Sequence, residues 1–211
     1  MAHIPDGVLS LPVLVAGGTL AAGGLALALR RLDDRALPKV AILAAAFFVA
    51  SLIAIPIGPT SVHLLLAGLM GLVIGWATLP AVFVGLLLQT VMFGFGGLST
   101  LGVNTVNIAG PGLVLGLALA PVLTRLSPAR AGLLAALAGG LAAAGTGGLV
   151  ALALVASSKS LAATAPIVLA TYLPLVVGEA IVTGLAVSFL KRVRPETFAA
   201  APAPLAAGVH P

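Results

Sequence analysis

The chain has 211 residues, of which 61% are hydrophobic and only 7% charged, and its mean hydropathy is +1.25. A soluble domain needs far less apolar sequence for its core, so this composition excludes that class and indicates an integral membrane protein. The net charge of +5 does not favour nucleic-acid binding, because aromatic residues are 4% and the basic residues stand at the ends of apolar runs.

Apolar runs long enough to cross ~30 Å of hydrocarbon as helices recur along the chain. Because a helix satisfies its own backbone hydrogen bonds in lipid, we predict an all-α, polytopic membrane bundle of about seven transmembrane helices. The third span is short for a full crossing and is expected to begin below the membrane surface. The predicted spans are residues 11–30, 40–57, 63–77, 79–96, 105–123, 131–156 and 166–190.

Basic residues divide unevenly between the two ends of this bundle, with Lys159 alone at one end. Short cytoplasmic loops carry the excess of positive charge, so the crowded end is predicted to be cytoplasmic, with the C-terminus there and the N-terminus outside. The outer face then holds the N-terminal tip, the turn at 58–62 and the loop at 96–105, so that His3 and His63 can meet. The crowded end carries Arg30, Arg31, Arg35, Lys39, Arg125, Arg130, Lys191, Arg192 and Arg194.

We expect residues 1–197 to form a single membrane-embedded domain. Residues 198–211 are rich in Pro and Ala and are expected to be a mobile tail, in which His210 has no role.

Ionisable side chains in or near the spans are the candidates for chemistry, since such groups are costly in a membrane. Two of them, His3 and His63, are imidazoles on one predicted face; the chain has no cysteine, so imidazole and oxygen are the available metal ligands. The alternative is that His3 is an interfacial residue and His63 caps a short helix.

Asp6, in "IPDG", is expected to turn the terminus back over the bundle, and a bond to a metal-bound imidazole is less favoured. Glu179 is expected to tie helices together, with a proton carrier or a partner contact as alternatives.

The position of His3 near the amino terminus predicts a chelate. A terminal amine, backbone amides and a nearby imidazole can surround a divalent ion with coplanar nitrogens, which suits Ni(II) or Cu(II). If Met1 is retained, the terminus fills four positions by itself. If Met1 is removed, Ala2 and His3 supply three nitrogens and His63 can supply the fourth; we favour this arrangement because it uses both histidines. No other processing of the terminus is expected.

The stretch "GGLSTLGVNT" (96–105) is polar and glycine-rich, and we expect it to be a lid over this site rather than a plain connector. Its polar members are Ser99, Thr100, Asn104 and Thr105. The chain has no G-x-x-x-x-G-K-[ST] loop, no G-x-S-x-G elbow and no H-E-x-x-H motif, so we expect neither ATP hydrolysis, nor hydrolase activity, nor a prosthetic group.

Several stretches together resemble the CbiM/NikM family, the substrate-binding membrane components of energy-coupling factor transporters for cobalt and nickel. They are "HIPDG", "RLDDRALP", "SVHLLLAGLMGLVIGW", "FGFGGLSTLGVNTVN" and "EAIVTGLAVSFLKRVRPE". The resemblance covers the chain to about residue 197. It implies seven helices, an inserted N-terminus and a planar metal site whose ligands here are Ala2, His3 and His63. In most relatives the histidine directly follows the initiator methionine, so Ala2 takes that residue's place.

The resemblance also implies a location in a prokaryotic plasma membrane and three kinds of partner: a transmembrane coupling protein, two cytoplasmic ATPases and a small auxiliary membrane subunit. Candidate contacts with the coupling protein are Ala46, Ala50 and Ala54. Phe95 and Tyr172 stand where relatives often have other residues, so no role is carried over to them. We expect Ni(II) as the substrate, with Co(II) as the alternative and a proton-coupled carrier using Glu179 as the less favoured one.

Overall fold

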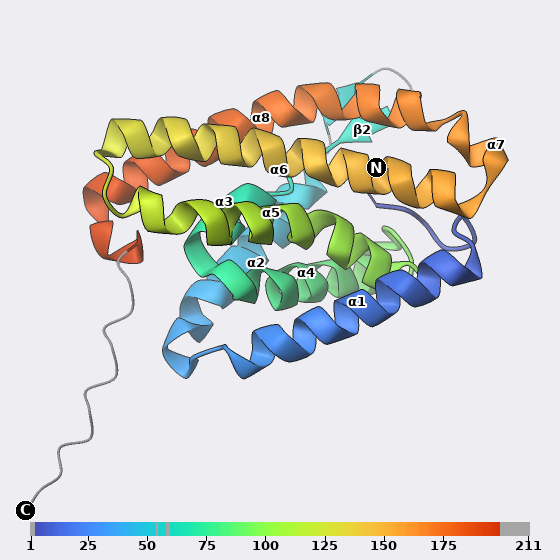
Figure 1. Ribbon diagram of the computed structural model, residues 1–211, viewed down its shortest axis with the longest axis horizontal. Coiled ribbons are helices and arrows are strands. Elements are labelled where there is room, and N and C mark those ends of the chain that lie inside the picture. The colour runs from blue at the N-terminus through green and yellow to red at the C-terminus, as the bar shows by residue number, and fades with distance from the viewer. Residues whose placement is uncertain (1–2, 54, 58–59, 199–211) are drawn as a thin grey trace, which may run out of the picture.

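The computed structural model describes residues 3–53, 55–57 and 60–198, and helices dominate it (Figure 1). The long helices run roughly parallel to the long axis, and α6 and α8 pack against each other more extensively than any other pair. The helices are α1 (Leu11–Arg30), α2 (Leu37–Leu52), α3 (Ala67–Ile74), α4 (Thr78–Phe93), α5 (Leu101–Leu123), α6 (Pro128–Ser157), α7 (Lys159–Ala162) and α8 (Ala165–Val193). Short 3-10 turns are η1 (Asp34–Ala36), η2 (Gly75–Ala77) and η3 (Pro195–Phe198).

Four of the long helices carry a proline in their first turn: α1, α2, α6 and α8. Proline is tolerated there because the first backbone N–H groups of a helix have no partner within the helix. These prolines therefore mark where the chain enters each helix, and the observed starts lie within a few residues of the predicted ones.

The second span ends earlier than predicted. Helix α2 stops at Leu52, and Ile55–Ile57 form strand β1, which pairs antiparallel with strand β2 (Thr60–Val62). Pro56 supplies no N–H to continue a helix, which accounts for the change of structure. The prediction of residues 40–57 as one helix was wrong at this hairpin, whereas the predicted all-α fold class is confirmed.

Helix α3 starts in the middle of the bundle. A Cβ on Gly68 would lie 2.6 Å from Cα of Gly139, which is near the centre of α6. With eight residues α3 is about 12 Å long, too short to cross a bilayer alone, in agreement with the shortness of the third predicted span. Gly75, at φ +50°, then turns the chain through η2 into α4.

Within the described residues, six helical stretches are long and apolar enough to span a membrane, counting α3 through α4 as one stretch. The seven predicted segments are all present, although one of them, α3, does not span alone. The protein is thus a multi-pass helical membrane protein.

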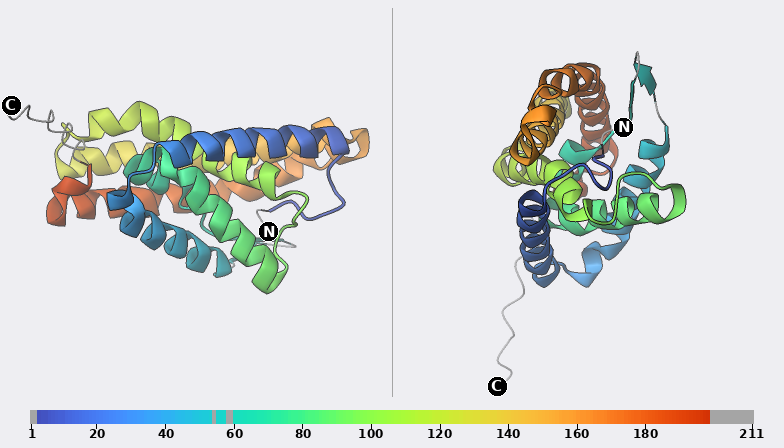
Figure 2. Two further views of the ribbon diagram at one scale, coloured as in Figure 1. Left: turned by 90° about the horizontal axis from the view of Figure 1, so that it is seen from below. Right: turned by 90° about the vertical axis from the view of Figure 1, so that its right-hand side faces the viewer.

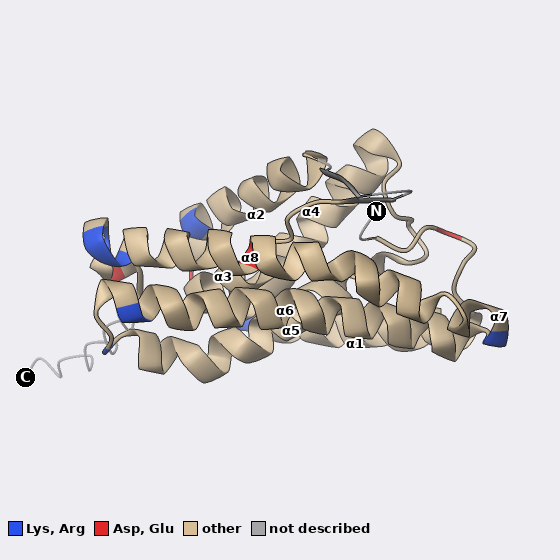
Figure 3. Ribbon diagram, turned by 90° about the horizontal axis from the view of Figure 1, so that it is seen from above, with Lys and Arg blue, Asp and Glu red and all other residues tan. Residues whose placement is uncertain are grey.

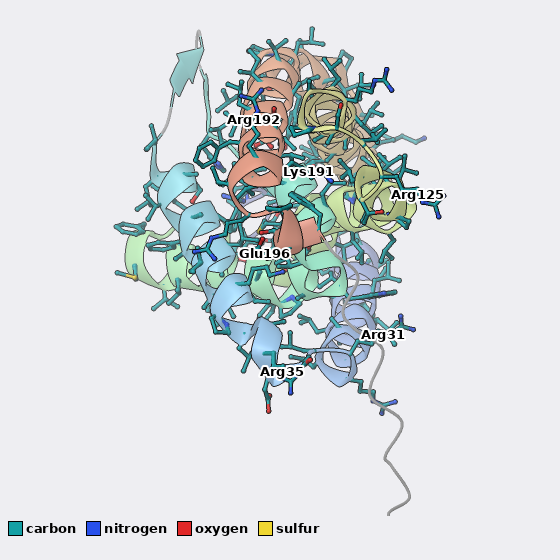
Figure 4. All side chains as sticks on the ribbon, turned by 90° about the vertical axis from the view of Figure 1, so that its left-hand side faces the viewer. Arg31, Arg35, Arg125, Lys191, Arg192 and Glu196 are labelled. Carbon is teal, nitrogen blue, oxygen red and sulfur yellow. The ribbon has the colours of Figure 1, made fainter. Side chains whose placement is uncertain are left out.

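The basic residues gather toward one end of this bundle, as the sequence predicts (Figure 3). Figure 4 looks onto that end, where Arg31, Arg125 and Lys191 come from different junctions of the chain. Lys191 Nζ donates to the carbonyl oxygen of Thr124 over 3.2 Å. Lys159 begins α7 at the opposite end.

The packed part of the chain reaches one residue past the predicted domain of 1–197, into the stretch predicted to be a mobile tail. Phe198, the last described residue of η3, is buried and packs in the same apolar cluster as Leu69, Leu72 and Leu123. Residues 199–211, with His210, lie outside the described part of the chain.

Candidate metal centre

The N-terminal segment turns back from the start of α1 along the bundle (Figure 2). Ser10 precedes α1, and the turn expected at Pro5-Asp6-Gly7 is present, with Gly7 at φ +79°. Glycine adopts a positive φ without steric cost, so it suits this position. His3 and Ile4, beyond the turn, are 5% and 4% exposed. The turn therefore inserts an imidazole into the protein instead of leaving it at the surface.

Two side chains of the α4–α5 region hold the backbone of Ile4. Asn104 Oδ1 accepts the Ile4 N–H at 3.0 Å, and Asn104 Nδ2 donates to the Ile4 carbonyl, also at 3.0 Å. Thr100 Oγ1 donates to the same carbonyl at 2.7 Å. Because both polar side chains are buried, these bonds fix the position of the residue that follows His3.

Asp6 holds the connecting loop at the surface. Its carboxylate accepts the N–H of Leu98 at 3.1 Å, the N–H of Ser99 at 2.9 Å and the Ser99 hydroxyl. The hydrogen bond from the Ser99 hydroxyl is the largest reason that the pKa of Asp6 lies below its usual value. A Cβ on Gly97 would lie 2.6 Å from the Asp6 nitrogen, so a residue without a side chain is needed there. Asp6 thus joins the terminus to the loop, and no bond to an imidazole is present.

The loop predicted at 96–105 is shorter than expected. Helix α5 begins at Leu101, which places Asn104 and Thr105 inside the helix. Gly102 misled the prediction: it lies inside α5, where a Cβ would be 2.7 Å from Cα of Gly18, so this glycine serves close packing against α1. Four of the predicted residues around the site, Asp6, Ser99, Thr100 and Asn104, nevertheless all contact the N-terminal segment or its partners.

His63 lies in a non-helical stretch between β2 and α3. Its Nδ1 is 3.2 Å from the carbonyl oxygen of Leu64. A carbonyl can only accept, so Nδ1 carries the proton in this contact and Nε2 keeps its lone pair.

Glu179 of α8 anchors the same stretch. Its Oε1 accepts the N–H groups of Leu65 and Leu66, the latter at 2.8 Å, and the residue is 1% exposed. Leu66 has φ +51°, a left-handed conformation that is uncommon for a residue with a side chain. The interpretation of Glu179 as a residue that ties helices together is confirmed, and what it holds is the segment carrying His63.

The two histidines meet inside the bundle. Their ring centroids are 4.9 Å apart with an interplanar angle of 32°, and each residue is 5% exposed. Neither ring nitrogen of His3 has a hydrogen-bond partner among the described residues. Burial, followed by the charge of His63, lowers the pKa of His3 to about 3. His3 is therefore neutral at physiological pH, the state in which an imidazole binds metals.

Two imidazoles alone do not complete a metal site. Within the described ranges, no group of three or more His, Asp or Glu side chains lies close enough to hold an ion. Met1 and Ala2, the predicted sources of amine and amide nitrogen, lie outside the described residues, as does Ala54. A four-nitrogen site at His3 and His63 would have to draw its remaining ligands from the amino terminus.

Sequence reasoning missed a buried polar pair that joins α4 to α2. Gln89 of α4 and Ser51 of α2 are 0% and 2% exposed, and Gln89 Nε2 donates to Ser51 Oγ at 2.6 Å. The available signal was a lone amide within the apolar run 79–96, which the high average hydropathy concealed.

Phe95 and Tyr172, which stand where relatives often have other residues, both make contacts within the structure. The carbonyl of Phe95 accepts from Thr90 Oγ1 at 2.9 Å, and its ring lies 5.8 Å from that of Phe93. Tyr172 is buried against α6, where a Cβ on Gly147 would lie 2.8 Å from Cγ of Tyr172.

Comparison with known families covers nearly all of this structure. A profile described as the cobalt uptake substrate-specific transmembrane region, CbiM, matches residues 3–197. The chain belongs to the CbiM family. The matched range contains His3, His63, Glu179 and the loop that Asp6 holds at Leu98 and Ser99. The family comprises metal transport components.

Individual relatives agree with this assignment. A protein of Haemophilus influenzae named for metal transport is 39% identical over 199 residues, covering 92% of this chain and 95% of that protein. The cobalt transport protein CbiM of Sorangium cellulosum is 33% identical and covers 92% and 93% of the two chains. A crystal structure of a truncated transition metal transporter superposes with a TM-score of 0.72 at 25% identity, covering 90% of this chain and 98% of that one. The fold and the broad role in cobalt or nickel uptake follow from these similarities.

Proposed function

We propose that this protein captures Ni(II) in a planar site of four nitrogens and delivers it as the substrate-binding component of an energy-coupled transporter. The observation that carries the proposal is the buried pair of His3 and His63, with centroids 4.9 Å apart and both nitrogens of His3 free of hydrogen bonds among the described residues. Buried polar atoms without partners are rare, and a ligand accounts for them here.

The donor set follows from the chemistry of the terminus. With Met1 removed, the amine of Ala2, the backbone nitrogen of His3 and the His3 ring supply three nitrogens. His63 supplies the fourth through Nε2, whose lone pair the contact of Nδ1 with Leu64 leaves available. A planar nitrogen field suits Ni(II), and all four groups must be deprotonated, so binding releases protons.

Co(II) is the second candidate substrate. The description of the matching family and the name of the Sorangium relative both refer to cobalt, whereas a relative in Rhodobacter capsulatus, 35% identical over 129 residues, is a fused nickel transport protein, NikMN. The order of affinity for nitrogen ligands places nickel above cobalt, which favours Ni(II) at an all-nitrogen site.

The remaining parts of the proposal concern orientation and partners. The excess of Lys and Arg at one end supports a cytoplasmic position for that end. The energy is proposed to come from two ATPase subunits through a transmembrane coupling protein, together with a small auxiliary subunit. Ala46 and Ala50 are half-buried on α2, which leaves part of each available to the coupling protein. The engagement of Glu179 with two backbone N–H groups makes it a poor proton carrier and disfavours a secondary carrier.

The experiment is a Ni(II) and Co(II) titration of the purified protein, followed by intact-mass measurement. The expected result is one ion per chain, a mass lacking Met1, and strongly weakened binding in His3→Ala and His63→Ala. His210→Ala, which removes the remaining histidine of the chain, is the matched control and should bind normally. Unchanged affinity in both His3→Ala and His63→Ala would overturn the site. Transport in vesicles that needs the ATPases supports the partners, whereas uptake by this protein alone would refute them.

A further inference from the structure

Gln89 presents an unpaired oxygen inside the protein. Its Nε2 donates to Ser51 Oγ at 2.6 Å, and Ser51 Oγ in turn donates to the carbonyl of Phe48 at 2.7 Å. This chain of bonds fixes which end of the Gln89 amide faces α2. The other end, Oε1, is buried and has no hydrogen-bond partner among the described residues.

Leaving a buried amide oxygen unpaired is destabilising, so an amide in this position needs a compensating role. His3 lies beside this part of α4: a Cβ on Gly96 would be 3.4 Å from Cβ of His3 and 3.7 Å from Oγ1 of Thr90, the residue that follows Gln89. Both ring nitrogens of His3 are buried and unpaired as well. Three unpaired polar atoms therefore belong to two neighbouring side chains.

The chelate proposed above tells the two ring nitrogens of His3 apart. Nδ1 lies close to the residue's own backbone nitrogen and can close a chelate ring with it, whereas Nε2 lies on the far side of the imidazole. Once Nδ1 binds the ion, Nε2 carries the proton and needs an acceptor. Metal-bound histidines usually donate this second N–H to a carboxylate or carbonyl oxygen.

We propose that Gln89, oriented by Ser51, accepts the Nε2–H of metal-bound His3 and so fixes the tautomer and plane of that ring. The inference rests on the proposed metal site and adds a positioning residue to it. Gln89 does not touch the ion; its Oε1, unpaired among the described residues, accepts the Nε2–H once Nδ1 binds the ion. Ser51 acts through Gln89: by accepting from Nε2, it holds the Gln89 amide with Oε1 toward the His3 ring.

The test uses the full-length protein in detergent, titrated with Ni(II), and with Cu(II) as a paramagnetic probe of the same planar field. Gln89→Leu should weaken Ni(II) binding by about tenfold or more and change the Cu(II) electron paramagnetic resonance spectrum. Gln89→Glu, which keeps an accepting oxygen in place, should recover most of both. Ser51→Ala should give a smaller loss in the same direction.

Thr78→Val is the matched control, because Thr78 is also fully buried on α4 with an unpaired hydroxyl and lies at the other end of the helix. It should leave affinity and spectrum unchanged. Wild-type affinity and spectrum in Gln89→Leu, in a preparation where His3→Ala has lost binding, would overturn the role of Gln89 and leave the metal site standing. If His3→Ala also binds normally, the proposed function itself fails. Should Gln89→Leu not fold, an unchanged spectrum and affinity in Ser51→Ala would refute the proposal.

Discussion

Asn104 pairs with both backbone groups of Ile4, accepting its N–H and donating to its carbonyl at 3.0 Å each. One side chain thereby satisfies a buried peptide segment that has no strand or helix to join. Since Ile4 follows His3, the same contact sets where the imidazole stands relative to His63. A membrane helix, α5, thus specifies the position of an otherwise irregular terminus.

Replacing Asn104 should loosen the terminus. Asn104→Ala removes the two hydrogen bonds to Ile4 and the one from Nδ2 to Thr100 Oγ1, and it leaves the Ile4 N–H buried without a partner, a loss of about 1–3 kcal/mol. We expect faster release of Ni(II), measured by competition with a chelator. Asn107→Ala is the control, because Asn107 is buried on the same helix and its Nδ2 has no partner among the described residues. Equal release rates in the two variants would show that the hydrogen bonds between Asn104 and Ile4 do not retain the metal.

The contact between Asp6 and the loop should fail in acid. The lowered pKa of Asp6 means that its ionised form is favoured in the folded protein, so the stabilisation is complete above the ordinary pKa of 3.8. It is lost as the pH falls through the lowered value. Hydrogen exchange at the Leu98 and Ser99 amides should therefore become less protected below about pH 4.

Asp6→Asn should abolish this acid dependence, because an amide side chain does not titrate. The amide of Gly94, which donates to the carbonyl of Thr90 at 3.1 Å, involves no carboxylate and serves as an internal control. Acid-dependent protection that persists at Leu98 and Ser99 in Asp6→Asn would assign the effect to another group.

Glu179 should tolerate an amide better than an apolar side chain. Both of its hydrogen bonds are accepted by Oε1, so Glu179→Gln can keep them, whereas Glu179→Leu leaves the N–H groups of Leu65 and Leu66 unpaired. We expect a lower unfolding temperature and weaker Ni(II) binding in Glu179→Leu, with Glu179→Gln close to wild type. Thr183→Val removes a buried, unpaired hydroxyl one turn along α8 and should change neither. If Glu179→Gln is as damaging as Glu179→Leu, the charge matters and the anchoring account is incomplete.

The sequence predicted the helical segments and the meeting of His3 with His63, because apolar length and the distribution of Lys and Arg are local signals that a membrane enforces. It misplaced the end of α2, where Pro56 interrupts an apolar run, and the start of α5, where Gly102 and Asn104 interrupt the apolar pattern but lie inside the helix. Gln89 could not be recognised, because its importance comes from Ser51 on another helix. Pairings between distant residues depend on packing that no single stretch encodes.

The contact between α3 and α5 should be the part of the fold least tolerant of added side-chain volume. A Cβ on Gly71 would overlap the carbonyl of Gly112, and one on Gly116 would overlap the carbonyl of Gly71, so α3 and α5 are in backbone contact. Gly71→Ala should force α3 away from α5, at a cost of about 1–3 kcal/mol, and displace the stretch from His63 to Leu66 that leads into it. The expected readouts are a lower unfolding temperature in detergent and weaker Ni(II) binding. Gly23→Ala is the control, since a Cβ there has no atom within 4 Å and alanine favours the helix. Normal metal binding in a destabilised Gly71→Ala protein would show that the His63 segment is positioned by Glu179 alone.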